Sequence, residues 1–527
     1  MGDKETIASF CMECGLILDE KKGIATPHAG GLGVLEGDNF LTARDLKQPY
    51  VAVSLLHHNG YVRQEIDGNS EQVDLDERFD MSLMERRKER VTVNIDRTER
   101  EVFCYQYSPF GTDLQTVLYL SVDGMDARLY RGDKIAKSMI LGIGGVRLLR
   151  EMGYDLYTMH FKINESNAAL TLIELLRTFE SEEIVKTHSS FVTHTTLPHG
   201  HDVYDLGYAR QRLQDDPMGR LLSSAEFQRF VSDGVLNLSN LASNIAGKTF
   251  AVSKQHGEIA RHNFPNISID YLTNGVHWSH ISERKQKVFD KYLGSWRIKP
   301  ELLRQSEKIP AEEIQDAHDL DKADLINYVK EETGVELSID RPISGFLRRQ
   351  TAYKRPLYLF SDIERLKSLV AKFGLQHIQG GKTHPDDTEG KNAIREYHRI
   401  MRDLDGAMRL TFIKNYGLTN HKILLNGIDF LIYSPVEDQE ACGTSYMKAM
   451  SSGVPVLGSL SGGFLEVCQD NVNSFAFRTQ EEFYDKLEHI LNEYRKNRLA
   501  ETRRNAIASG AFASSVRAFQ EFRAKIE

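Results

Sequence analysis

A segment near the C-terminal end of the chain combines residue types that can form a ligand site. It runs from Glu440 to Lys448 and reads E-A-C-G-T-S-Y-M-K. A carboxylate opens the turn, Gly443 lets the backbone approach a ligand closely, and Lys448 lies on the helix predicted to follow. Taken alone, a lysine on a helix is usually a surface residue. The assignment of Lys448 therefore depends on the residues around it.

A basic loop follows the predicted strand over residues 343–347. It places four cations in a protein whose net charge is −9: Arg348, Arg349, Lys354 and Arg355. Arginine can bind phosphate through two parallel hydrogen bonds, and lysine supplies a point charge. The loop is therefore either a phosphate site or a cluster of solvated charge, and residue types alone leave both interpretations open.

Two turns have groups that suit an anion or a sugar. His28 to Asp38 is glycine-rich, with Gly30 and Gly31 leading into a predicted helix, so free backbone N–H groups can face a ligand. Asn274 precedes a glycine, and its amide can both donate to and accept from a sugar hydroxyl. A purely structural turn remains the alternative in each case.

Overall composition excludes several classes of protein. The chain has 527 residues, enough for two or three domains, with 41% hydrophobic and 27% charged residues. Its negative net charge argues against general binding to nucleic acid or to membrane surfaces. We recognise neither a bilayer-spanning apolar run nor a signal peptide, and we expect a cytoplasmic enzyme.

We expect no metal site and no disulfide framework. The five cysteines are scattered, and Cys11-x-x-Cys14 lacks the second ligand pair that a zinc site requires. His194, His199 and His201 are a second group of potential ligands. We favour a place in a cleft for this stretch, which the resemblance given below implies.

The elements that must position these residues are alternating strands and helices. Apolar runs predict strands over 50–56, 117–122, 191–195, 343–347, 428–433 and 454–457. A helix is predicted over 361–374, with Ser361 and Glu364 as a capping box and Gly374 as its C-terminal stop. This alternation predicts an α/β fold with parallel sheets.

Two such blocks predict two Rossmann-like domains, over residues 1–271 and 272–527. The stretch 501–527 looks helical and could pack back across the boundary. Ligands of parallel sheets bind beyond the carboxyl ends of the strands, so we expect the site in the cleft between the domains.

In their order along the chain, these motifs resemble those of the α-glucan phosphorylases, which include glycogen and maltodextrin phosphorylase. The resemblance extends from about Ile7 to Ala476 and is closest to the short prokaryotic form. It implies a GT-B fold, with two Rossmann-like domains whose parallel sheets face each other across a cleft.

The resemblance also implies a pyridoxal 5'-phosphate cofactor and roles for individual residues. Lys448 would form a Schiff base with the cofactor, and Arg349 and Lys354 would hold the reacting phosphate. The other residues implied at the cofactor are Thr444, Arg348, Tyr416 and Gly31. The residues implied at the glucan are Gly30, Gly31, Asn167, Asn274, Glu440, Cys442 and Gly443.

Two of these positions depart from the family pattern. Asn167 stands where the family has a histidine that contacts glucose, and Cys442 replaces a common serine. An asparagine can still bond to a hydroxyl, but its shape and its pKa differ from those of histidine.

The implied reaction is retaining phosphorolysis of an α-1,4-glucan by inorganic phosphate, or its reversal from glucose 1-phosphate. The resemblance also implies a homodimer. One alternative is a nucleotide-sugar glycosyltransferase such as a glycogen synthase, which would favour glutamate at position 448. The other is a non-catalytic glucan-binding homologue, which the change at Asn167 would favour.

Overall fold

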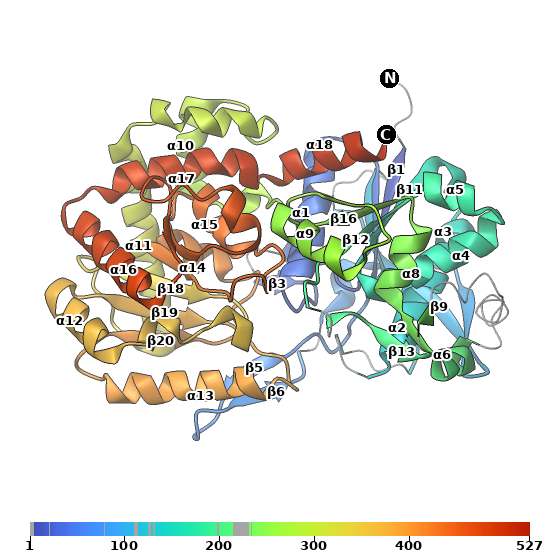
Figure 1. Ribbon diagram of the computed structural model, residues 1–527, viewed down its shortest axis with the longest axis horizontal. Helices are drawn as coiled ribbons and strands as arrows, with labels where there is room; N and C mark the ends of the chain where they lie inside the picture. Colours follow the sequence, from blue (N-terminus) through green and yellow to red (C-terminus); the bar gives the residue numbers. More distant parts are fainter. Residues whose placement is uncertain are drawn as a thin grey trace.

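The computed structural model of the protein describes residues 5–19, 22–77, 79–109, 114–124, 128–129, 132–197, 200–213, 231–232 and 234–527. The chain forms two large β-sheets with helices packed around them, and these sheets lie side by side in Figure 1. The predicted α/β fold with parallel sheets is confirmed. None of the helices in the described ranges is both long and apolar enough to cross a membrane.

The N-terminal sheet consists of strands that precede residue 272. Its order is β17 (Ile269–Tyr271), β16 (Lys248–Ala251), β12 (Ser189–Val192), β11 (Met159–Asn164), β1 (Thr6–Phe10), β4 (Tyr50–Leu55), β10 (Gln115–Val122), β9 (Thr98–Tyr107) and β7 (Glu85–Arg86), with β8 (Val91–Ile95) pairing with β9. Strands from β17 to β10 pair in parallel, and β9 joins β10 antiparallel. Every residue of β4 is buried, as expected of a strand covered on both faces.

The C-terminal sheet is parallel throughout. Its order is β20 (Leu410–Ile413), β19 (Gln376–Gly380), β18 (Ile343–Leu347), β21 (Phe430–Tyr433), β22 (Val456–Ser459) and β23 (Phe475–Phe477). The strand predicted over 343–347 is confirmed with the same bounds. The strand predicted over 191–195 instead ends at Val192, where the chain turns toward the cavity described below.

Helices accompany both sheets. Those before residue 272 are α1 (Gly31–Asp45), α2 (Lys134–Met139), α3 (Gly145–Glu151), α4 (Leu170–Phe179), α5 (Glu182–Thr187), α6 (Leu206–Leu213), α8 (Leu238–Ile245) and α9 (Lys254–Asn263). Those after it are α10 (Glu283–Leu293), α11 (Ala311–Thr333), α12 (Ile363–Phe373), α13 (Thr388–Asp403), α14 (His421–Gly427), α15 (Ser445–Ser451), α16 (Gln480–Arg495), α17 (Leu499–Ala513) and α18 (Ser515–Ile526).

The start of α12 differs from its prediction. Asp362, not Ser361, is the N-cap, and its carboxylate accepts a hydrogen bond from the backbone N–H of Arg365. Both residue types cap helices well, and the shift by one residue puts the stronger acceptor in place. The predicted stop at Gly374 is confirmed, because this residue adopts the left-handed conformation with φ 73°.

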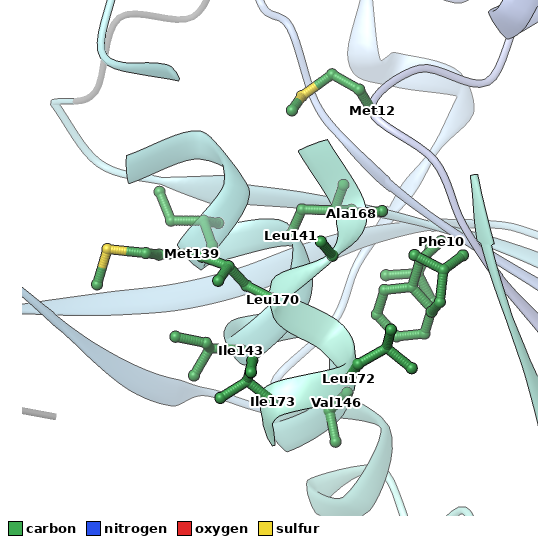
Figure 2. Close-up of a cluster of buried hydrophobic side chains, with 14 of the residues drawn as sticks. Phe10, Met12, Met139, Leu141, Ile143, Val146, Ala168, Leu170, Leu172 and Ile173 are labelled. Atoms are coloured by element: carbon green, nitrogen blue, oxygen red, sulfur yellow. The ribbon is translucent and has the colours of Figure 1, made fainter. Parts of the chain in front are cut away.

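The core on one face of the N-terminal sheet depends on a glycine. Gly145 begins α3 where the helix lies against the sheet, and a Cβ there would approach Phe10 Cε1 to 2.7 Å and Val53 Cγ1 to 2.9 Å. Figure 2 shows part of this core, in which Leu141 and Leu170 pack among other buried apolar side chains. These distances show that a residue larger than glycine at this position would push the helix away from the sheet.

Two segments join the parts of the chain that carry the two sheets. The hairpin β5 (Arg63–Ile66) and β6 (Gln72–Leu75) contacts α13, and both lie at the bottom of Figure 1. Gln64 and Asn415 exchange hydrogen bonds there, at 2.6 Å from Gln64 N to Asn415 Oδ1. At the top of the view, α18 extends from α17 to pack against α1.

Candidate active site

A cavity of about 1170 Å³ is lined by residues from both sheet-bearing parts of the chain. It receives the loops that follow β18, β19 and β21 and the start of α1, as expected for ligands beyond the carboxyl ends of parallel strands. All the site residues predicted from the sequence line this cavity: Gly30, Gly31, Asn167, Asn274, Arg348, Arg349, Lys354, Tyr416, Glu440, Cys442, Gly443, Thr444 and Lys448.

Three charged side chains form a buried ion-paired group on one wall. Glu440 accepts hydrogen bonds from Arg348 Nη2 at 2.7 Å and from Lys354 Nζ at 2.9 Å. The Arg348 guanidinium also lies 4.5 Å from the centre of the Tyr433 ring. Its Nε and Nη1 atoms are buried and have no hydrogen-bond partner among the described residues. Arg348 therefore retains donors directed away from Glu440.

The charges of this group determine the protonation state of Glu440. Burial alone would raise the pKa of its carboxyl, but the charges of Arg348 and Lys354 outweigh burial and lower that pKa to about 2. Glu440 is therefore an anion at neutral pH and is a poor candidate for a general acid.

Glu440→Gln should destabilise the ligand-free protein in a pH-dependent way. Because the pKa of Glu440 is below its ordinary value of 4.5 in the folded protein, its stabilising effect is fully present above about pH 4.5 and is lost toward about pH 2. The difference in Tm between wild type and variant should therefore be larger at pH 7 than at pH 3.

The control for this comparison is Glu437→Gln, which changes an exposed carboxylate in the same loop. The Tm of this control variant should stay close to that of the wild type from pH 7 to pH 3. A Glu440→Gln difference that stays constant from pH 7 to pH 3 would contradict the assignment.

The glycine-rich turn meets the basic loop from the other side. A Cβ on Gly30 would lie 3.3 Å from Arg349 Nε, and a Cβ on Gly31 would lie 4.0 Å from Thr444 Oγ1. Arg349 is exposed at the cavity and Thr444 is the N-cap residue of α15. The absence of side chains on the turn thus leaves space where a ligand can touch both groups.

Lys448 lies inside the cavity wall, and not on the protein surface. It is on α15 with 8% of its surface exposed, and burial lowers the pKa of its amine. No hydrogen bond or ion pair to its Nζ is found among the described residues. A buried amine with a lowered pKa is the form in which lysine acts as a nucleophile toward carbonyl groups.

Amide groups lie on the remaining wall. Asn274 Nδ2 donates to the backbone oxygen of Cys442 at 3.3 Å. Asn167 Oδ1 is buried without a hydrogen-bond partner among the described residues.

A strained turn of the backbone precedes Asn167. Glu165, two residues before it, has a φ of 68°, which is rare for a residue with a side chain and costs about 1–3 kcal/mol. The Glu165 carboxylate accepts hydrogen bonds from the backbone N–H groups of Ser166 and His194, which holds this strained turn in place.

The sequence did not indicate three polar residues that meet beside Lys448. Asp38 was part of a recognised motif without an assigned role, and His280 and His421 carried no signal at all. His280 Nε2 lies 2.8 Å from Asp38 Oδ1, and its Nδ1 lies 2.6 Å from His421 Nε2. Since the three come from distant segments, only the folded structure reveals the contact.

The histidines considered as metal ligands are placed in different ways. His194 lines the cavity, while His201 Nδ1 lies 2.8 Å from Ser239 Oγ. His199 lies outside the described residues. Within the described part of the chain, no group of three or more His, Cys, Asp or Glu residues is arranged to hold a metal ion.

Comparisons with known proteins agree with this architecture. The family model of carbohydrate phosphorylases matches residues 232–527. The chain is 30% identical to a maltodextrin phosphorylase of Thermococcus litoralis, with 88% of this chain and 61% of the relative covered. It is 30% identical to a glycogen phosphorylase of Aquifex aeolicus (83% and 72% covered) and 28% identical to an uncharacterised protein of Methanocaldococcus jannaschii (87% and 85% covered).

The chain thus spans about three fifths of the length of the Thermococcus relative and most of the length of the Methanocaldococcus protein. The family match covers more than half of the chain and includes the basic loop and the Lys448 segment. Together with the two-sheet α/β scaffold of GT-B type, these matches show that the protein belongs to the carbohydrate phosphorylase family.

Proposed function

We propose that the protein catalyses reversible, retaining phosphorolysis of an α-1,4-glucan to glucose 1-phosphate, with pyridoxal phosphate held at Lys448. One observation supports this most directly. The buried amine of Lys448, the basic loop that begins at Arg348 and the glycine-rich turn all line one cavity. The names of the relatives, maltodextrin and glycogen phosphorylase, suggest the class of substrate.

The residues of the cavity fit the proposed cofactor. Lys448 offers an amine for its aldehyde. Arg348 has buried Nε and Nη1 donors without hydrogen-bond partners among the described residues. The hydroxyl of Ser445, next to Thr444, is also buried without such a partner. Guanidinium and hydroxyl groups are the donors that bind phosphate. Gly31 leaves space opposite Thr444 for the body of the cofactor.

The remaining cations would bind and orient the substrate phosphate. Arg349 and Lys354 line the cavity on the same loop as Arg348, so they can offset the repulsion between two neighbouring phosphates. When bound, pyridoxal phosphate supplies a phosphate group with a second pKa of about 6, which can exchange a proton with the substrate phosphate near neutral pH. A pair of catalytic carboxylates is then unnecessary, which agrees with Glu440 being tied to two cations.

The glucan would lie along the wall that carries the amides. The Asn167 and Asn274 side chains can each donate to and accept from sugar hydroxyls. Backbone at Cys442 and Gly443 faces the same space, and a Cβ on Gly443 would lie 2.8 Å from the Tyr433 hydroxyl. A larger residue at Gly443 would therefore disturb the wall on which the sugar rests.

The test combines a spectrum with an assay. Purified full-length protein is mixed with pyridoxal phosphate, its absorbance spectrum is recorded, and borohydride reduction is followed by peptide mapping. We expect a cofactor band, modification of Lys448, and glucose 1-phosphate release from maltodextrin and phosphate. The matched control is Lys372→Ala, an exposed lysine on α12, which should leave both results unchanged.

Other outcomes would identify the alternatives. Absence of cofactor binding, with glucosyl transfer from ADP- or UDP-glucose, would overturn the proposal in favour of a nucleotide-sugar transferase. Maltodextrin binding without turnover would overturn it in favour of a non-catalytic glucan-binding protein. The homodimer stays a prediction from the resemblance, and the cytoplasmic location stays a prediction from the sequence.

A further inference from the structure

Asp38, His280 and His421 form a continuous hydrogen-bonded row beside Lys448. His280 Nε2 faces both oxygens of Asp38, at 2.8 and 3.0 Å, and His280 Nδ1 faces His421 Nε2 at 2.6 Å. His421 Nδ1 lies 2.9 Å from the backbone oxygen of Leu418. The three side chains come from α1, from the short 3-10 helix Trp278–His280 and from α14, and all are buried.

The number of protons in this row follows from the group at its end, the backbone oxygen of Leu418. A backbone oxygen can only accept a hydrogen bond, so His421 Nδ1 carries a proton. One proton lies between the two imidazoles, and one lies between His280 Nε2 and Asp38. Without that last proton, two acceptors would face each other at 2.8 Å in a buried site.

Each arrangement of these protons gives the row zero net charge. The row is neutral when Asp38 holds the last proton, and it is a carboxylate paired with one imidazolium when a histidine holds it. Burial raises the pKa of Asp38 to about 6, which is the direction that retains the proton. Burial also lowers the pKa values of His280 and His421, so neither imidazole favours a positive charge of its own.

The other titratable groups around the row are cations or are paired elsewhere. Lys448 and Lys422 are the lysines whose charges act on His280. His277 lies against Asp38 through its backbone N–H, but its Nε2 points to Asp45 Oδ2 at 2.9 Å. Its Nδ1 accepts from the backbone N–H of Ser279 at 3.2 Å, which makes the Asp45 contact a donation.

Lys448 would behave differently if Asp38 were an unpaired anion. Asp38 is the charged group that raises the pKa of the Lys448 amine, against the effect of burial. A carboxylate near an amine favours the ammonium form and can raise the amine pKa by about 1–3 units. An ammonium cannot attack an aldehyde, so the charge of Asp38 affects cofactor attachment directly.

We infer that Asp38, His280 and His421 act as positioning residues that retain one shared proton, cancel the charge of Asp38 and so keep the Lys448 amine uncharged. The inference rests on the proposed function, because it requires Lys448 to react with an aldehyde. It assigns a role to three buried residues that act on Lys448 through their charge and hydrogen bonds.

The experiment measures how readily Lys448 adds to pyridoxal phosphate as a function of pH. Full-length protein freed of cofactor is mixed with pyridoxal phosphate between pH 5.5 and 9.5, trapped with borohydride, and the Lys448 peptide is quantified by mass spectrometry. The initial rate gives a midpoint pH for the wild type and for each variant. No turnover by the loaded enzyme is involved.

His280→Gln removes the group that shares the proton with Asp38. The carboxylate should then be ionised, and the midpoint should rise by about one pH unit, with about a tenfold lower rate at pH 7. The double variant Asp38→Asn with His280→Gln carries no charge there, so its midpoint should return to that of the wild type. An unchanged midpoint in His280→Gln, or a rise that the double variant retains, would overturn the inference.

Asp38→Asn alone gives an independent result if His280→Gln does not fold. Its amide can donate to His280 Nε2 and keeps the shape of the carboxyl group. If the row is neutral in the wild type, the midpoint should not move. A midpoint about one unit lower would show that Asp38 was an anion and would overturn the inference. Failure of wild-type Lys448 to react at every pH would instead refute the proposed function.

Discussion

We expect Lys448→Ala to give a folded protein that neither retains pyridoxal phosphate nor releases glucose 1-phosphate from maltodextrin. The substitution removes the buried amine proposed to hold the cofactor while leaving Arg348 and Lys354 paired with Glu440. Loss of a covalent attachment point should lower kcat/KM by roughly 10⁴-fold or more. The measurement compares absorbance spectra and phosphorolysis rates of variant and wild type, with circular dichroism to establish folding.

Lys448→Arg is the matched control for charge and size. Arginine keeps a positive charge and a long side chain, but its guanidinium does not act as an amine toward an aldehyde. We therefore expect it to be as inactive as Lys448→Ala. Substantial activity in either variant without bound cofactor would show that Lys448 has no chemical role.

Of the substitutions discussed, Asp429→Ala should lower the free energy of unfolding the most. Asp429 lies just before β21, and its carboxylate is paired with Lys322 Nζ at 2.8 Å and with Arg503 Nη2 at 3.1 Å. It also accepts from the backbone N–H of Ile343 at 2.8 Å and faces His318 Nε2 at 3.0 Å. Removal of the carboxylate leaves two buried cations unpaired, which should lower the free energy of unfolding by about 3–5 kcal/mol.

The measurement is urea unfolding of the variant beside Asp316→Ala. Asp316 is an exposed carboxylate on α11, the same helix that carries His318 and Lys322. Its substitution should change the free energy of unfolding by no more than about 0.5 kcal/mol. Equal effects of the two substitutions would mean that the buried group adds nothing beyond an ordinary surface charge. Because Asp429 anchors α11 and α17 to the C-terminal sheet, its loss should also loosen the loop that carries Glu440.

The gathering of the site residues could be predicted because it follows from strand order. Arg348 and Glu440 each come after a strand of one parallel sheet, and the carboxyl ends of parallel strands meet at the same edge. Gly30 and Gly31 were expected near a ligand for another reason, because free backbone N–H groups at the start of a helix suit an anion or a sugar. Motif order and this geometric rule were enough to place all of these residues around one cavity.

The partners of the charged residues could not be predicted in the same way. Nothing in the spacing shows that Glu440 pairs with Arg348 and Lys354, because that contact depends on how two loops pack. The row of Asp38, His280 and His421 depends on the approach of two sheet-bearing parts of the chain. Local rules also leave an uncertainty of one residue, as Asp362 and Ser361 show at the start of α12.

The way α18 covers the beginning of the chain has a consequence for biogenesis. Phe519 lies 6.0 Å from the ring of Tyr50, and Ser515 Oγ lies 2.5 Å from Thr42 Oγ1. A ribosome that adds about 5–20 residues per second needs on the order of tens of seconds to travel from Tyr50 to Phe519. During that time the apolar side chains that α18 will cover remain without their partner. The nascent protein therefore passes through an interval in which a chaperone can bind this surface, and the interval ends only when α18 has left the exit tunnel.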